Sequence, residues 1–358
     1  AALADAGATS TTTAAGLAGG DGRDTLANRG TVRIEDIAAE SDAVGVSVDI
    51  KIAKNGLGVG AALVKSGVAS TAEATGLSGG AGNDTLVNDG DIDILRSTAK
   101  ADAVGVSVAL AASSNGVNVA AGLADGSSSA TASGRGLAGG AGDDLAVNRG
   151  HIGISGLRAD GSATSVSLGL AGANNGISAS AALADSSATA IAGATGIDGG
   201  EGHDELWNMS GIAIGDIKAH AVAVSADVAI SGTLSAGVAA GAALGRASAT
   251  AEAAAVGVDG GAGDDRLANK ADGHIVIDDV GASTTAVGVS VQLGVVSNGA
   301  AVGAALVDTS TTARAAAVGL QGGLGDDVMS NAGELTLQNI HADALAVSVS
   351  VTGNAALN

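Results

Sequence analysis

Long stretches of the chain alternate between large aliphatic residues and small or polar residues. Residues 43–52 read Ala-Val-Gly-Val-Ser-Val-Asp-Ile-Lys-Ile, and the alternation resumes at Leu57 after Asn55-Gly56. The same pattern returns at 103–110, 286–293 and 344–351. Alternation with a period of two predicts β-strands with one buried face.

The two faces of these strands differ in size. We expect the aliphatic side chains to form the buried face, and Gly, Ser and Ala to form the outward face. In the first stretch the buried face would consist of Val44, Val46, Val48, Ile50 and Ile52. A helix would not fit, because the valine spacing has the wrong period and glycine, scattered throughout, costs a helix about 1 kcal/mol per residue.

The chain is also an internal repeat. The pair Gly-Gly recurs at positions 19, 79, 139, 199, 260 and 322, so successive spacings are 60 to 62 residues (79 − 19 = 60, 322 − 260 = 62). We therefore interpret residues 1–358 as a single array. Its units are 1–18 (partial), 19–78, 79–138, 139–198, 199–259, 260–321 and 322–358 (partial).

Three columns are invariant when the six copies are aligned. The fourth position is always Gly, at Gly22, Gly82, Gly142, Gly202, Gly263 and Gly325. The sixth is always Asp, at Asp24, Asp84, Asp144, Asp204, Asp265 and Asp327. The tenth is always Asn, at Asn28, Asn88, Asn148, Asn208, Asn269 and Asn331.

Three all-β architectures fit such a unit. The first is a β-solenoid with three coils of roughly 20 residues per unit, and the second is a wide, flattened solenoid with one coil per unit. The third stacks long hairpins that turn at Asn-Gly, a strong hairpin signal, although Asn-Gly also turns the chain between two sheets. A parallel solenoid is favoured, because in parallel, in-register strands the asparagine side chains form a hydrogen-bonded ladder.

The pattern Gly-Gly-x-Gly-x-Asp-x-Leu-x resembles the nonapeptide of the RTX family of secreted calcium-binding repeat proteins. It stands here as Gly19-Gly20-Asp21-Gly22-Arg23-Asp24-Thr25-Leu26-Ala27, and again at 79–87. The resemblance implies that glycine carbonyls and the Asp carboxylate bind Ca²⁺, while the Leu points into the core. The implied ligands are the six aspartates with Gly20, Gly22, Gly80, Gly82, Gly140, Gly142, Gly200, Gly202, Gly261, Gly263, Gly323 and Gly325.

Physical chemistry agrees with this resemblance. Ca²⁺ takes six to eight oxygen ligands, many of them backbone carbonyls. Carboxylates stacked about 4–5 Å apart repel one another by roughly 1 kcal/mol in water and about 4 kcal/mol at an effective dielectric constant of 20. The alternative is a bare tight turn, in which Asp bonds its own backbone and Gly supplies the left-handed residue.

The motif also departs from the family pattern. The nonapeptides of that family are tandem, whereas here they come singly, and only one coil per unit would stack them directly. The third copy is shifted by one residue (Asp144-Leu145-Ala146), and the sixth has Met329 in the Leu column.

Composition narrows the function. The chain has no Cys, which excludes a disulfide scaffold and a thiol nucleophile. It also has no Pro, Phe or Tyr. Its net charge of −21 makes nucleic acid and anionic membrane surfaces improbable partners and favours cations. We expect no membrane insertion, because the long uncharged stretches alternate and are interrupted by Asn-Gly.

Other candidate sites are weaker. The doublets Asp143-Asp144, Asp264-Asp265 and Asp326-Asp327 could add ligands, but solvated surface charge explains them better. A solvated strand end explains the column of Asp5, Asp125, Asp185 and Asp308, which Lys65 and Arg246 interrupt. We interpret the histidines as lying in different columns, which argues against a repeated histidine metal site (His151, His203, His220, His274 and His341).

The termini begin and end partway through a unit. Either further units continue the array, or copies of the chain complete each other head to tail. We therefore expect a non-enzymatic structural protein, the calcium-stiffened stalk or filament body of an extracellular bacterial surface adhesin with a cell-surface or matrix ligand. One alternative is a subunit that polymerises into a filament or sheath. The other is a non-catalytic secretion and folding region of a secreted enzyme.

Overall fold

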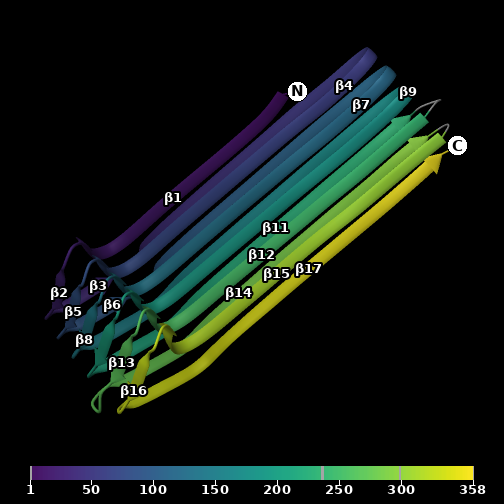
Figure 1. The fold of residues 1–358 in the computed structure, drawn as a ribbon. Coiled ribbons are helices and arrows are strands. Elements are labelled where there is room, and N and C mark those ends of the chain that lie inside the picture. The colour runs from purple at the N-terminus through teal and green to yellow at the C-terminus, as the bar shows by residue number, and fades with distance from the viewer. Residues whose placement is uncertain (1, 235–237, 298–299, 358) are drawn as a thin grey trace.

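The computed structural model describes residues 2–234, 238–297 and 300–357, and their regular elements are β-strands (Figure 1). The 17 strands form an 11-stranded sheet and a six-stranded sheet. Pairing is parallel in both sheets. The predicted all-β solenoid is confirmed.

Short strands form a narrow base at one end of the molecule. The six-stranded sheet consists of β2 (Thr25–Asn28), β5 (Thr85–Asn88), β8 (Leu145–Asn148), β10 (Glu205–Asn208), β13 (Arg266–Asn269) and β16 (Val328–Asn331). A second side of the base contains β3 (Thr31–Ile34) and β6 (Asp91–Ile94), whose counterparts in later units are the first residues of longer strands.

Long strands form a flat blade that extends from the base (Figure 1). They are β1 (Ala2–Asp21), β4 (Ile37–Ala81), β7 (Ser97–Ala141), β9 (His151–Glu201), β11 (Gly211–Leu234), β12 (Val238–Ala262), β14 (His274–Ser297), β15 (Ala300–Leu324) and β17 (Glu334–Leu357). In β4 a first arm, 37–54, runs away from the base, and a second arm, 57–81, returns to it. The stretch around Asn55-Gly56 is an arc between the arms.

Each sequence repeat forms one coil of the stack. Ala2 pairs with Ala62 and Ile37 pairs with Ser97, so partners stand 60 residues apart (62 − 2 = 60, 97 − 37 = 60). This register selects the wide solenoid with one coil per unit. Stacked hairpins were the wrong alternative, because each arm pairs with the same arm of the neighbouring unit.

Extra residues are absorbed at the corners. The offset between partners rises from 61 at Asn208–Asn269 to 63 at Gly211–His274 (269 − 208 = 61, 274 − 211 = 63). The added residues make a turn in which the Gly273 amide donates to the Lys270 carbonyl at 2.8 Å. The neighbouring strands therefore keep their register.

The base contains a core of large aliphatic side chains. Ile94, Ile154 and Ile217 are fully buried, and Leu86 and Leu206 are nearly so. Full burial of such a side chain is worth roughly 1.5–3 kcal/mol. Because every unit contributes to the same columns, this core runs along the whole stack.

The blade has a different interior, and here our expectation about its faces was wrong. Val44, Val46, Val48, Ile50 and Ile52 are between 53% and 66% exposed. The residues between them, Ala43, Gly45, Ser47 and Asp49, are buried instead. The aliphatic side chains therefore lie on the outside of the first arm.

The reason is the closeness of the two arms. The hydroxyls of Ser47 and Ser107 reach across the interior and donate to the carbonyls of Lys65 and Asp125 at 2.8 and 2.7 Å. A Cβ added at Gly169 would lie 2.6 Å from the Leu183 carbonyl oxygen of the opposite arm. Only Gly, Ala, Ser and a few compact polar groups fit such a thin layer.

Candidate functional site

The glycine–aspartate motif forms the corner where each second arm ends and a short base strand begins. Both predicted glycine columns have positive φ, from 108° at Gly20 to 138° at Gly263 and Gly325. A Cβ at Gly82 would lie 1.8 Å from the Gly22 carbonyl oxygen of the preceding unit. Conformation and stacking therefore both require glycine here.

Glycine is required at the first position of the motif for a different reason. A Cβ at Gly79 would lie 2.7 Å from Asp84 Oδ2, and a Cβ at Gly139 would lie 2.6 Å from Asp144 Oδ2. The aspartate carboxylate thus packs on the α-carbon of this glycine. Three glycines and one aspartate form a single interlocked corner.

The aspartates form a ladder along the stack. The backbone amide of Asp24 donates to Asp84 Oδ1 at 2.7 Å, and the Asp84 amide donates to Asp144 Oδ1 at 2.7 Å. The same bond links Asp144 to Asp204, Asp204 to Asp265, and Asp265 to Asp327. Each aspartate side chain therefore caps the amide of the unit before it, rather than its own turn.

The second carboxylate oxygen of the ladder has no partner. Oδ2 is buried without a hydrogen bond at Asp24, Asp84, Asp144, Asp204 and Asp265. Burial raises the pKa of Asp204 to about 7, and the neighbouring carboxylates Asp144 and Asp265 add to the rise. Burial also raises the pKa of Asp144 and of Asp265.

A small cavity is lined in part by two of these aspartates. It has a volume of about 30 Å³ and is lined by Asp144, Asp204, Gly199 and Leu206, among others. One water molecule needs roughly 10–15 Å³ of such volume and two to four polar partners. The cavity is therefore large enough for a single water or a small ion.

The glycine carbonyls do not converge on the aspartates as the resemblance implies. The Gly20 and Gly22 carbonyls point along the stack at Gly80 and Gly82, and the Ala81 carbonyl accepts from the Gly22 amide at 2.6 Å. Within the described residues, no group of three or more Asp, Glu or His side chains is arranged to hold a metal ion.

The corner residues therefore do not fit a complete calcium site. Two stacked carboxylates about 4.8 Å apart supply two ligands to an ion between them, whereas Ca²⁺ takes six to eight. The tight turn accounts for the three glycines without a metal. It does not account for the unpartnered Oδ2 atoms, which are the one feature that still suggests a cation.

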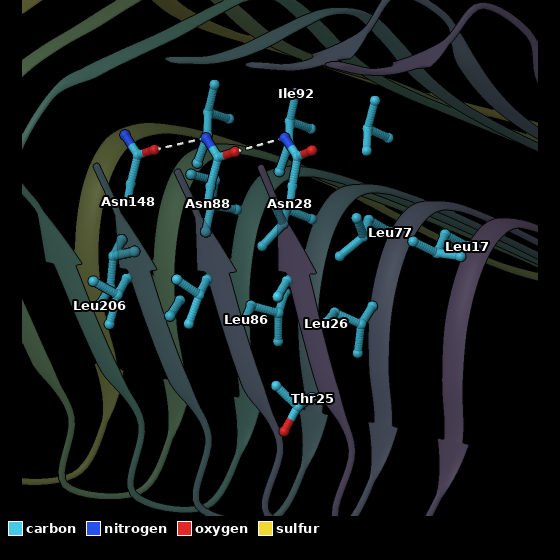
Figure 2. Close-up of a pocket in the computed structure, with 18 residues that line it drawn as sticks. Leu17, Thr25, Leu26, Asn28, Leu77, Leu86, Asn88, Ile92, Asn148 and Leu206 are labelled. Carbon is cyan, nitrogen blue, oxygen red and sulfur yellow. Dashed lines mark hydrogen bonds between the residues drawn. The ribbon is translucent and has the colours of Figure 1, made fainter. Parts of the chain in front are cut away.

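The asparagines form a second ladder at the next corner (Figure 2). Nδ2 of Asn28 donates to Oδ1 of Asn88 at 2.8 Å, and Asn88 donates to Asn148 at 2.9 Å. The series continues through Asn208 and Asn269 to Asn331. This unbroken chain of amides links all six base strands.

An elongated apolar cavity of about 270 Å³ lies inside the base. Figure 2 shows Leu26, Leu86 and Leu206 along one of its sides. The third copy of the motif keeps its register, since Asn148 pairs with Asn88, and so it places Ala146 in the leucine column. The small Ala146 side chain leaves space that a leucine would fill.

A further ladder lies on the outside of the same corner and was missed from the sequence. The column before the aspartates holds Asn83, Asp143, His203 and Asp264. Asp143 Oδ1 accepts the His203 amide at 2.9 Å, and His203 Nδ1 accepts the Asp264 amide at 2.9 Å. The side chains of this column differ chemically, so the sequence does not show that they accept hydrogen bonds from backbone amides of the next unit.

Two other sequence interpretations need correction. The column of Asp5, Asp125, Asp185 and Asp308 lies within the second arms, not at a strand end. Lys65 and Arg246 stand in the same column, each between two of these acids, and Arg246 lies 3.5 Å from Asp308. His151 and His274 share one column on either side of Gly211, so the histidines do not all lie in different columns.

A buried polar group was also not foreseen. Asp227 lies between the arms and accepts from Ser290 Oγ at 2.8 Å and from Gln292 Nε2 at 2.6 Å. Gly245 makes room for it, because a Cβ there would overlap Gln292 and lie 2.1 Å from Asp227 Oδ2. Asp227 occurs in one unit only, so the comparison of repeats does not single it out.

Searches with this chain find no matching family model, curated protein or solved structure. The described residues contain no helix long and apolar enough to cross a membrane.

Proposed function

We propose that this chain is a structural segment of a wide, flat β-solenoid filament on the outside of a bacterial cell, as in the body of a surface adhesin. The observation that supports this most is the register. It continues through every unit, from Ala2–Ala62 to Ser297–Leu357, so the repeat of the sequence is the repeat of one uniform stack.

The dimensions of the stack favour a broad filament or sheath over a slender stalk. Six coils rise only about 29 Å at a strand spacing near 4.8 Å, whereas an arm of 18 residues is about 60 Å long. Each unit is therefore far wider than the length that it adds to the stack. A secreted enzyme's folding region is less favoured, since it would not need such width.

The two ends of the stack give the filament a route to grow. The outer strands of the large sheet, each paired with one strand only, are β1 and β3 at one end of the stack and β15 and β17 at the other. Unpaired edges are templates for further strands. Additional coils of a longer chain, or copies of this one, would continue both ladders without a change of register.

Electron microscopy and fibre diffraction of the isolated chain test this proposal. We expect unbranched ribbons of constant width with a meridional reflection near 4.8 Å along the fibre axis. Discrete particles that never associate end to end, at any concentration, would contradict growth by addition of copies.

Calcium stiffening is a separate proposal, supported by the unpartnered Oδ2 atoms of the aspartate ladder. We expect Ca²⁺ to raise the melting temperature, followed by circular dichroism and by the fluorescence of Trp207, and chelator to lower it. The variant Asp144→Asn with Asp204→Asn should lose this response. Equal melting with and without Ca²⁺, and no bound calcium in equilibrium dialysis, would leave the motif as a turn only.

A further inference from the structure

The outward side of the first arms is a continuous aliphatic surface. We call it the valine face and define it as the five stacked columns that begin with Val44, Val46, Val48, Ile50 and Ile52. In β4 these side chains are more than half exposed, and at the other end of the stack, in β17, Val347, Val349 and Val351 are 37%, 42% and 47% exposed. Large aliphatic residues dominate the columns, and Thr164 is the one polar side chain among their described members.

The opposite side of the same thin blade has a different character. Near the arc the outward positions of the second arms also carry exposed aliphatic residues, among them Val59, Val119, Val302 and a leucine column, followed by the charged column of Lys65 and Arg246. Towards the base they carry serine, threonine and charged residues such as Ser129, Thr189 and Glu252. The aliphatic columns of this side end at the column of Lys65, whereas those of the valine face continue further along the arm, so the valine face is the larger apolar surface.

We propose that the valine face binds the valine face of a second copy of this chain, so that two stacks pair laterally. Large uninterrupted apolar patches on a protein surface mark interaction sites. A second copy has a matching pattern, because both surfaces repeat at the same strand spacing. Ridges of side chains from one sheet can then pack between those of the other, as in stacked sheets about 10 Å apart.

The size of the valine face suits a stable dimer. Eight residue steps from the first to the last column cover about 26 Å, six strands cover about 29 Å, and the product is roughly 750 Å² per copy. Specific interfaces bury about 800 Å² per partner. The two surfaces would meet without placing an unpaired charge between them.

Charge also selects the orientation of the two copies. The border of the valine face towards the base is charged. Glu40 and Asp42 lie there in β4, whereas Asp102 and Asp160, in the next two strands, form ion pairs with Lys100 and Arg158. A twofold axis that lies in the interface and runs along the stack, perpendicular to the strands, places this border of one copy at the arc end of the other. The acidic borders are then far apart, and Lys54, exposed near the arc, approaches the acids of the partner copy.

A lipid surface is the less favoured occupant. The chain is strongly acidic, its one aromatic residue, Trp207, belongs to the base, and the border of the valine face is acidic. Interfacial surfaces typically combine apolar residues with a basic and aromatic fringe.

Sedimentation velocity of the whole chain tests the proposal. We expect a dimer at concentrations too low for end-to-end growth into ribbons. Val106→Lys with Val166→Lys, in adjacent strands of the valine face, should raise the dissociation constant by at least about 100-fold, because each ammonium group would be buried unpaired. The matched control, Ser129→Lys with Thr189→Lys, places the same charges on the same two strands at the opposite side and should leave the dimer intact.

A second measurement does not depend on charged substitutions. The chain has no cysteine, so Leu168→Cys on the valine face and Thr189→Cys on the opposite side each introduce a unique thiol. A short bismaleimide should link two copies through Leu168→Cys only.

Four results would overturn lateral pairing. One is a wild-type chain that stays monomeric, and another is equal weakening by both lysine pairs. The third is cross-linking through both cysteines alike. The last is binding of the monomer to phosphatidylcholine vesicles through this face. End-to-end growth at β1 and β17 is independent of all four, so the filament proposal and lateral pairing can fail separately.

Discussion

At the residue scale, the corner glycines illustrate how a stack constrains single positions. Gly140 has φ of 122°, and the carbonyl oxygen of Gly80 would lie 1.9 Å from an added Cβ. Gly193, in the second arm of β9, has nothing within 4 Å of an added Cβ. Two glycines in the second arms of the neighbouring strands β7 and β9 thus have opposite tolerance.

Gly140→Ala should therefore destabilise the chain by about 3 kcal/mol or more, since a positive-φ residue costs about 1–3 kcal/mol and the clash adds a similar amount. Gly193→Ala should change stability by less than about 1 kcal/mol, because alanine fits there and restricts the unfolded chain. Denaturant unfolding followed by circular dichroism compares the two. Equal effects would show that adjacent units do not approach each other as closely as described.

Asp227 is the other informative residue, because it is an acid without a counter-ion. Its side chain is 1% exposed. Burial raises the pKa of Asp227 to about 6, while hydrogen bonds from Ser290 and Gln292 oppose the rise. Asp227 Oδ1 and Gln292 Oε1 both lack partners.

This pKa predicts the direction of a pH effect. The folded chain binds a proton at Asp227 more tightly than the unfolded chain does, so this residue's contribution to stability falls as pH rises from about 4 to 6. A rise of roughly two units corresponds to about 3 kcal/mol lost at pH 7. Asp227→Asn should thus melt at a higher temperature at pH 7 and show a flatter pH profile.

The control for this prediction is Asp308→Asn, at an exposed carboxylate. It should leave the pH profile of melting unchanged. If Asp227→Asn keeps the wild-type slope between pH 4 and 6, the buried carboxylate is not the group that titrates.

At the element scale, the sequence predicts the strands but not which way they face. The alternation at 43–52 indicates period two, and the invariant Asn column indicates parallel stacking; both follow from local pattern. Hydrophobicity alone predicts that the aliphatic residues are buried. This prediction is wrong because the separation of the arms is a property of pairs of strands about 20 residues apart.

The overlooked signal was the size of the alternate residues. Gly45, Ser47 and their stacked counterparts are small, which fits a thin interior that excludes valine. In the base, by contrast, the arrangement is three-sided and wider, so Leu86, Ile92 and Ile94 are buried in the usual sense. One unit therefore contains two cores, a thin one of small residues in the blade and a wider one of large aliphatic residues in the base.

Part of the candidate site could be predicted from the sequence and part could not. The conformation of the glycines could be predicted, since Gly-Gly-x-Gly is a local signal. The role of the aspartates could not, because Asp84 Oδ1 accepts from the amide of Asp24, 60 residues away. Hydrogen bonds between units depend on register, which the sequence indicates only once the stack is known.

At the scale of the whole molecule, the chain is a one-dimensional array in which each coil contacts its neighbours. Such an array should tolerate the loss of a whole coil, but not of part of one. Ile37, Ser97 and Leu157 occupy the same position in three successive units. Deletion of residues 97–156 therefore joins Arg96 to Leu157 with every column preserved.

We expect this shortened chain to fold, with unchanged strand content per residue and the same Trp207 emission. Asn88 and Asp84 would then stack on Asn208 and Asp204, which continues both ladders. Small-angle scattering should show a stack shorter by about 4.8 Å and a blade of the same length.

The matched control removes half a coil, residues 97–126, and joins the base to the middle of a second arm. It deletes fewer residues, yet it misaligns every column on one side of the junction. We therefore expect it to lose its circular dichroism signal or to aggregate. If the half-coil deletion folds as well as the whole-coil deletion, register is not what holds the stack together. Stability would then reside in the individual arms, and neither the ladders nor growth at the edges of β1 and β17 would follow from the repeat.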